Sequence, residues 1–193
     1  MNRIFLFIIL SVFAISINAQ KIEVDRMEDD GRRQLMCSGK KEKLDGLEYN
    51  FMLKAFEKYN HIDWCLLVSS FVYIPENVSL LLKLGNDKVL YLNVNNRTVD
   101  DITMPSYSYL IGNIAYSTSQ RTADYYKALF ELTEEQLKEI EEYGILKVRI
   151  SSRNSYNEKT WRKDKLGKFL AKSWHKMAER YSTTEVKSIW DEF

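Results

Sequence analysis

A chain of 193 residues that is 45% hydrophobic and 13% aromatic contains enough apolar material for a sizeable core, which excludes a mainly disordered protein. Its 28 basic and 27 acidic residues give a net charge of +1. A protein whose main partner is nucleic acid is usually clearly basic, so we expect no nucleic-acid partner.

The first twenty residues, MNRIFLFIILSVFAISINAQ, follow the order of a secretory signal peptide. A positive charge at Arg3 precedes an apolar run that is short for a membrane span, and small or polar residues follow. We expect cleavage after Ala19, with Ser16 as a second site and an uncleaved anchor helix as the alternative. The sequence therefore predicts an exported protein, periplasmic or secreted, with residues 1–19 as signal peptide and no transmembrane segment after cleavage.

The chain up to about residue 131 is typical of short strands. Turn residues between apolar runs predict two hairpins. These hairpins join residues 21–27 to 32–38 through Asp30-Gly31, and residues 79–84 to 89–94.

Two longer stretches in this part also predict strands. Residues 47–55 alternate between apolar and polar, although Leu47, Phe51 and Ala55 also share one helical face, so a helix is the alternative. Residues 63–73, DWCLLVSSFVY, are apolar at both alternating sets of positions. This pattern predicts a central strand that is covered on both faces.

The middle of the chain contains one polar stretch followed by two more apolar ones. The polar stretch at residues 95–106 contains Pro105 and predicts a long loop. Residues 107–117, YSYLIGNIAYS, predict one strand with a bulge or bend at Gly112. Residues 123–132 fit either a strand or a helix.

A helix over residues 133–143 has the clearest local signals. Thr133 is the expected N-cap, and Gln136 completes a capping box. Gly144 suits the left-handed position that ends a helix. A strand is expected directly after it, followed by a turn and a short final strand.

The C-terminal segment KDKLGKFLAKSWHKMAERYS, residues 163–182, predicts a second helix with one apolar and one basic side. The apolar side favours packing on a sheet. The basic side favours solvent exposure, and its alternative role is contact with an anionic lipid or polysaccharide. The basic residues on this side are Lys165, Lys168, Lys172 and Lys176.

These elements together predict an α+β fold. We expect a mostly antiparallel sheet of hairpins, with the helices at 133–143 and 163–182 packed against it. Residues 20–193 are expected to form a single domain.

The layout of the chain resembles that of small exported bacterial proteins of unknown function. The resemblance rests on the signal peptide, on KIEVDRM at the mature start, and on LTEEQLKEIEEYGILKVRI before a basic C-terminal helix. It implies no activity and transfers no site.

The sequence contains few residues suited to catalysis. His61 and Asp63 lack a third ligand nearby, so no metal site and no cofactor are expected. Cys37 and Cys65 either form a disulfide, which export permits, or are two buried free thiols, which suits the apolar strand around Cys65.

Aromatic residues gather near the predicted loop and suggest a binding surface. Tyr107 and Tyr109 are the first of a group that continues to residue 126, and exposed tyrosines form rigid amphipathic contact surfaces. Strand aromatics that face the core are the alternative. We expect a non-catalytic binding or interaction module whose partner is an envelope protein, an anionic lipid or a polysaccharide. The alternative is a periplasmic or secreted hydrolase.

Overall fold

The computed structural model describes residues 21–183 except residues 60, 107, 113 and 154. The predicted signal peptide, residues 1–19, lies outside the described residues. Within them the strands are β1 (Ile22–Met27), β2 (Arg33–Cys37), β3 (Lys40–Leu44), β4 (Leu47–Lys58), β5 (His61–Ser70), β6 (Ser79–Leu84), β7 (Val89–Met104), β8 (Ser108–Ile111), β9 (Ile114–Ser117), β10 (Arg121–Leu132), β11 (Ile145–Ser151) and β12 (Tyr156–Thr160). The helices are α2 (Glu134–Tyr143) and α3 (Leu166–Thr183).

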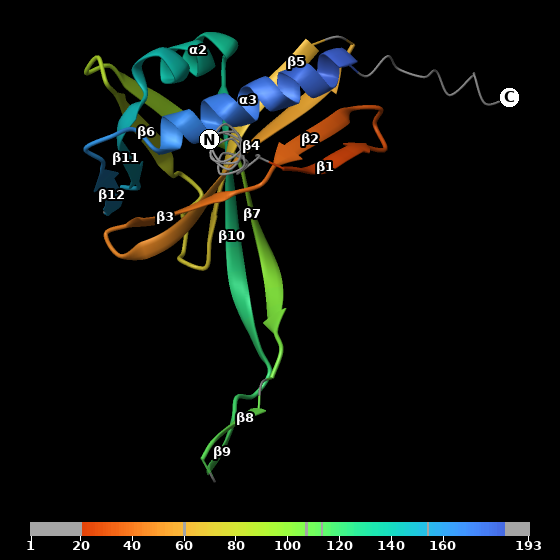
Figure 1. Ribbon diagram of the computed structural model, residues 1–193, viewed down its shortest axis with the longest axis vertical. Coiled ribbons are helices and arrows are strands. Elements are labelled where there is room, and N and C mark those ends of the chain that lie inside the picture. Colours follow the sequence, from red (N-terminus) through yellow and green to blue (C-terminus); the bar gives the residue numbers. More distant parts are fainter. Residues whose placement is uncertain (1–20, 60, 107, 113, 154, 184–193) are drawn as a thin grey trace, which may run out of the picture.

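Most of the strands form one antiparallel sheet in the order β1-β2-β4-β5-β10-β7-β6-β11-β12, with β3 paired beside β4. The helices α2 and α3 contact each other and pack against this sheet, α3 on β2 and β4 and α2 on β6 (Figure 1). The predicted α+β class, a mostly antiparallel sheet with two helices packed on it, is confirmed.

The core lies between the sheet and the helices. Leu53 of β4 pairs with Leu66 of β5, which pairs with Phe130 of β10, and all three are at most 1% exposed. The strand β5 therefore lies inside the sheet, as predicted, but the helices cover only one of its faces, and Leu67 on the other face is half-buried. On the face that the helices cover, the ring of Trp64 meets Trp174 and Tyr181 of α3 edge-on, with centroid distances of 6.5 Å in both cases.

The sheet is curled, so that β12 near one end lies against β3. The backbone N–H of Asp45 donates to the carbonyl oxygen of Glu158 at 3.1 Å. Beside this bond, the ammonium of Lys159 lies 2.6 Å from the carboxylate of Glu42, which is only 9% exposed. This contact joins β12, at one end of the strand order, to β3, which is paired beside β4.

Local signals in the sequence explain α2 and the hairpins. The Thr133 hydroxyl accepts from the N–H of Gln136 at 3.2 Å, and the Gln136 side chain accepts from the N–H of Thr133 at 2.9 Å. Gly144 ends the helix with φ 67°. The predicted capping box is confirmed, and both predicted hairpins are present as β1–β2 and β6–β7.

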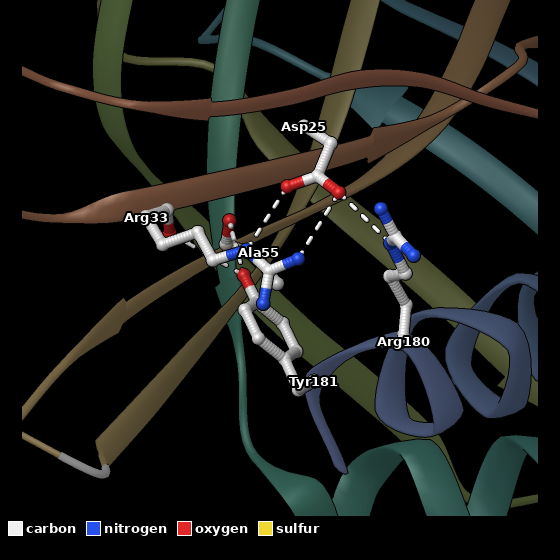
Figure 2. A network of polar contacts seen from close by, with 5 residues as sticks. All are labelled: Asp25, Arg33, Ala55, Arg180 and Tyr181. Carbon is white, nitrogen blue, oxygen red and sulfur yellow. Dashed lines mark hydrogen bonds and ion pairs between the residues drawn. The ribbon is translucent and has the colours of Figure 1, made fainter. Parts of the chain in front are cut away.

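A polar network fixes the C-terminal end of α3 to the sheet (Figure 2). The Asp25 carboxylate of β1 accepts from Arg33 at 2.9 and 3.0 Å and from Arg180 at 2.9 Å. The Tyr181 hydroxyl donates to the carbonyl of Ala55 at 3.2 Å. No helix in the described part of the chain has both the length and the apolarity to cross a membrane.

The structure resolves or corrects four sequence expectations, three of them between residues 89 and 132. The predicted loop at 95–106 is wrong, because β7 continues as a strand to Met104 and pairs with β10. The single strand predicted at 107–117 is instead a hairpin, β8–β9, in which Gly112 has φ 59°. The ambiguous segment 123–132 belongs to strand β10, and residues 47–55 form a strand, as preferred.

Candidate functional site

A long two-stranded arm leaves the body of the protein. Beyond the root pair Asn96–Leu129, β7 and β10 pair only with each other out to Met104 and Arg121, apart from the contact that β10 keeps with the end of β5. Figure 1 shows this arm extending away from the helices, with β8 and β9 at its far end. Because the outer half of the ribbon has no core to cover, its residues are mostly polar and exposed.

Aromatic contacts hold the root of the arm to the body. The ring of Tyr125 lies 4.8 Å from that of Phe71, and Tyr126 meets Tyr73 edge-on at 5.3 Å. The guanidinium of Arg97 lies against both of the latter two rings, 5.6 Å from the centre of Tyr73 and 4.9 Å from that of Tyr126. Its Nε also donates to the carbonyl of Ile74 at 2.9 Å. These contacts fix the direction in which the arm leaves the sheet.

The far end of the arm, which we call the tip, is apolar and open. It consists of β8 and β9, in which Tyr109 pairs with Tyr116 and Ile111 with Ile114. The two tyrosine rings stack at 5.4 Å with 12° between their planes. Leu110, Ile111 and Ile114 are 73%, 61% and 60% exposed.

The sequence around the tip has no charge. Residues 105–120 contain no Lys, Arg, His, Asp or Glu, although 28% of the whole chain is charged. Alternation along the strands places Tyr109 and Ile111 with their partners on one face and Leu110 on the other. Contiguous exposed apolar surface is typical of an interaction site.

The predicted tyrosine surface agrees with this arrangement in part. Tyr109 lies in the tip and is exposed, together with Tyr116. Tyr107 lies outside the described residues. Sequence reasoning missed Leu110, Ile111 and Ile114, because residues 107–117 were interpreted as one strand with a bulge or bend at Gly112 rather than as an exposed hairpin.

The predicted basic side of the C-terminal helix lies on the solvent side of α3. Lys165, Lys168 and Lys172 are exposed and Lys176 is half-buried, whereas Leu170 on the other side is 0% exposed. The Asp164 carboxylate accepts from the backbone N–H groups of the first turn, at 2.8 Å each, and so caps the helix. The lysines therefore lie along the outside of a structural helix.

The two cysteines do not meet. Cys37 faces α3, with its Sγ 3.8 Å from the carbonyl of Ser173. Cys65 follows Trp64 in β5 and therefore points to the opposite face of the sheet. Both are free and buried, so the structure has the two-thiol alternative rather than the disulfide.

Neither cysteine is poised as a nucleophile. Burial raises the pKa of both thiols to about 11, so they are protonated at neutral pH. His61 is exposed beside Asp63 at 3.1 Å, and His175 pairs with Glu141 of α2 at 2.7 Å. The described part of the chain contains no group of three or more His, Cys, Asp or Glu side chains that would hold a metal ion.

No protein-family model matches the chain, and comparison with curated proteins and with solved structures gives no match.

Proposed function

We propose that the chain is an exported, non-catalytic interaction module that binds a protein partner through the tip of its arm. The observation that carries this proposal is the uncharged tip, whose Leu110, Ile111 and Ile114 side chains are all more than half exposed. Exposed aliphatic and aromatic side chains on a projecting hairpin suit insertion into an apolar groove of a partner.

A protein partner fits the tip better than a bilayer does. The described strands β8 and β9 pair only with each other, so each leaves one backbone edge unpaired. Inside a bilayer, unpaired backbone groups have no hydrogen-bonding partner, and each costs several kcal/mol. A protein groove provides backbone and side-chain partners, and strand addition at an open edge is a common form of recognition.

The alternative of a hydrolase has no favourable observation in the described residues, since both thiols are buried and protonated. The exposed lysines of α3 leave a contact with an anionic surface as the second way to bind. It is not our preferred function, because isolated exposed lysines are equally typical of a solvated helix.

Photo-crosslinking in the native host tests the proposal. Tyr116 of the tip is replaced by benzoylphenylalanine, and Tyr59, a 91% exposed tyrosine on the body, is replaced in the matched control. We expect one discrete protein adduct from position 116 and none from position 59. The adduct should disappear when Ile111→Asp and Ile114→Asp are combined with it, and it should persist with Tyr59→Asp.

Two results would contradict the proposal. One is an adduct from position 116 with lipid alone, accompanied by co-sedimentation of the wild-type protein with phospholipid vesicles. The other is an adduct that survives both Asp substitutions at the tip. Because the tip makes no core contact, melting temperatures of all variants should stay close to the wild-type value.

A further inference from the structure

The face of the sheet opposite the helices contains a hollow, which we call the basic trough. Alternate residues of β1, β2, β4, β5, β7 and β10 line it. Its volume is about 530 Å³, within the range of about 300–1,000 Å³ that is typical of small-molecule sites. A larger open depression continues from it, and Lys54, Asn96 and Leu129 line both.

Five apolar side chains, which together we call the floor, line the basic trough: Val24, Met36, Met52, Leu67 and Leu129. Gln34, Asn50, Asn96, Thr98 and Tyr125 also line it and are polar. None of the floor side chains is packed under a helix, because both helices lie on the other face of the sheet. Methionine side chains adapt easily to the shape of an apolar ligand.

Three cationic side chains surround this floor, and two of them have carboxylate partners. Arg26 pairs with Glu28 at 3.0 Å, and Lys127 pairs with Asp100. For Lys54, the described residues place no carboxylate within ion-pair distance. Its ammonium lies 4.5 Å from the centre of the Phe56 ring.

The environment of Lys54 is unfavourable for a charge. Burial lowers its pKa, the attraction of Glu28 opposes this, and repulsion from Arg26 and Lys127 adds to it. A partly buried charge without a counter-ion is costly, and an anion placed beside it removes that cost. The charge pattern therefore favours a ligand with an anionic group, and the floor favours an apolar part in the same ligand.

We propose that the basic trough binds a single-chain amphiphile, with its anionic head at Lys54 and its apolar tail on the floor lined by Met36 and Met52. The ligand is thus a carboxylate of the fatty-acid type. The site lies on the body and on the first residues of the arm, and it does not include the tip, so it is independent of the partner proposed there.

Calorimetric titration with laurate below its micelle concentration tests this site. The full mature chain should bind laurate, and Lys54→Met should weaken binding at least tenfold, because the tail remains but the counter-charge is lost. Lys43→Met, on the exposed side of β3, is the matched control and should bind as the wild type does. Ile111→Asp with Ile114→Asp should also leave laurate binding unchanged, which separates this site from the tip.

Two neutral or short probes distinguish head from tail. Dodecanol should bind equally to wild type and Lys54→Met, since it has no charge to pair. Acetate should bind far more weakly than laurate. The proposal is overturned if laurate does not bind the wild type, or if it binds Lys54→Met with unchanged affinity. It is also overturned if acetate binds the wild type as tightly as laurate does. Thermal melting of Lys54→Met should show a folded protein at least as stable as the wild type, because a poorly paired charge has been removed.

Discussion

Asp25 connects three parts of the chain through one carboxylate. It accepts hydrogen bonds from Arg33 in the neighbouring strand and from Arg180 at the end of α3 (Figure 2). The hydrogen bond from Arg33 is the main cause that holds the pKa of Asp25 below its ordinary value, and Arg180 adds to it against the effect of burial. Protonating this carboxylate weakens the attachment of α3 to the sheet.

This lowered pKa predicts an acid-sensitive contribution to stability. A carboxyl group whose folded pKa is lowered stabilises the fold above its unfolded pKa of about 3.9 and loses that effect as the pH falls through the folded value. Asp25→Asn should therefore be less stable than wild type at neutral pH, and the difference should shrink below about pH 3.9. Urea unfolding across this range measures it. Asp101→Asn on the exposed arm is the control, and a constant gap for Asp25→Asn would contradict the prediction.

Leu170 shows what the apolar side of α3 contributes. Its side chain is 0% exposed, so Leu170→Asp places an unpaired carboxylate in the core. We expect a loss of roughly 3 kcal/mol or more in the free energy of unfolding. Lys168→Glu combined with Lys172→Glu, on the exposed side, should change it by less than about 1 kcal/mol. An unchanged melting temperature for Leu170→Asp would mean that this side of the helix is not buried.

The thiols of Cys37 and Cys65 allow a direct chemical test. Native protein should react slowly with an alkylating agent, because both side chains are at most 3% exposed. Denatured protein that has not been reduced should take up two labels, visible by mass spectrometry. Absence of label on the unreduced, denatured chain would indicate a disulfide and would contradict the opposite-face placement.

At the scale of elements, α2 depends on its first turn. Thr133→Ala removes the hydroxyl that accepts from the N–H of Gln136 and should cost about 1 kcal/mol of stability. Thr133→Ser keeps that hydrogen bond and should stay close to wild type. Chemical denaturation of the two variants compares them, and an equal loss in both would show that the methyl group matters rather than the cap.

Elements with short-range signals could be predicted from the sequence, whereas others could not. The capping box of α2 and the turn at Asp30-Gly31 depend on neighbouring residues only. The outer part of β7 was predicted as a loop because its residues are polar, but polarity there reflects two solvated faces rather than an irregular backbone. β3 was not predicted, although Asp45-Gly46, both with positive φ, is a hairpin turn signal.

At the scale of the whole molecule, the arm is an appendage of the body. Replacing residues 103–122 by Asn-Gly, which joins Ile102 to Ala123 across an existing strand pair, should leave the melting temperature within a few degrees of wild type. The shortened protein should lose the crosslinked partner and retain laurate binding. A strongly destabilised product would mean that the arm contributes to the stability of the body.

The candidate site could be predicted only in part, because the exposure of its residues depends on tertiary structure. Aromatic composition indicated Tyr109, but exposure of Leu110 and Ile114 depends on how far the ribbon projects, which is a tertiary property. The basic trough likewise assembles residues from six strands, and Lys54 and Lys127 are far apart in the sequence. Neither arrangement has a local signature.

The continuous register of the arm means that its length is set by the number of residue pairs. From the pair Asn96–Leu129 to the pair Met104–Arg121, the register between β7 and β10 contains no bulge. Adding two residues to each strand would move the tip outward by about 7 Å and keep the same side chains on the same face. Because two-stranded ribbons twist strongly, the same addition would also turn the tip about the long axis of the arm. Reach and orientation are thus set together by the number of residue pairs, without any change in the core.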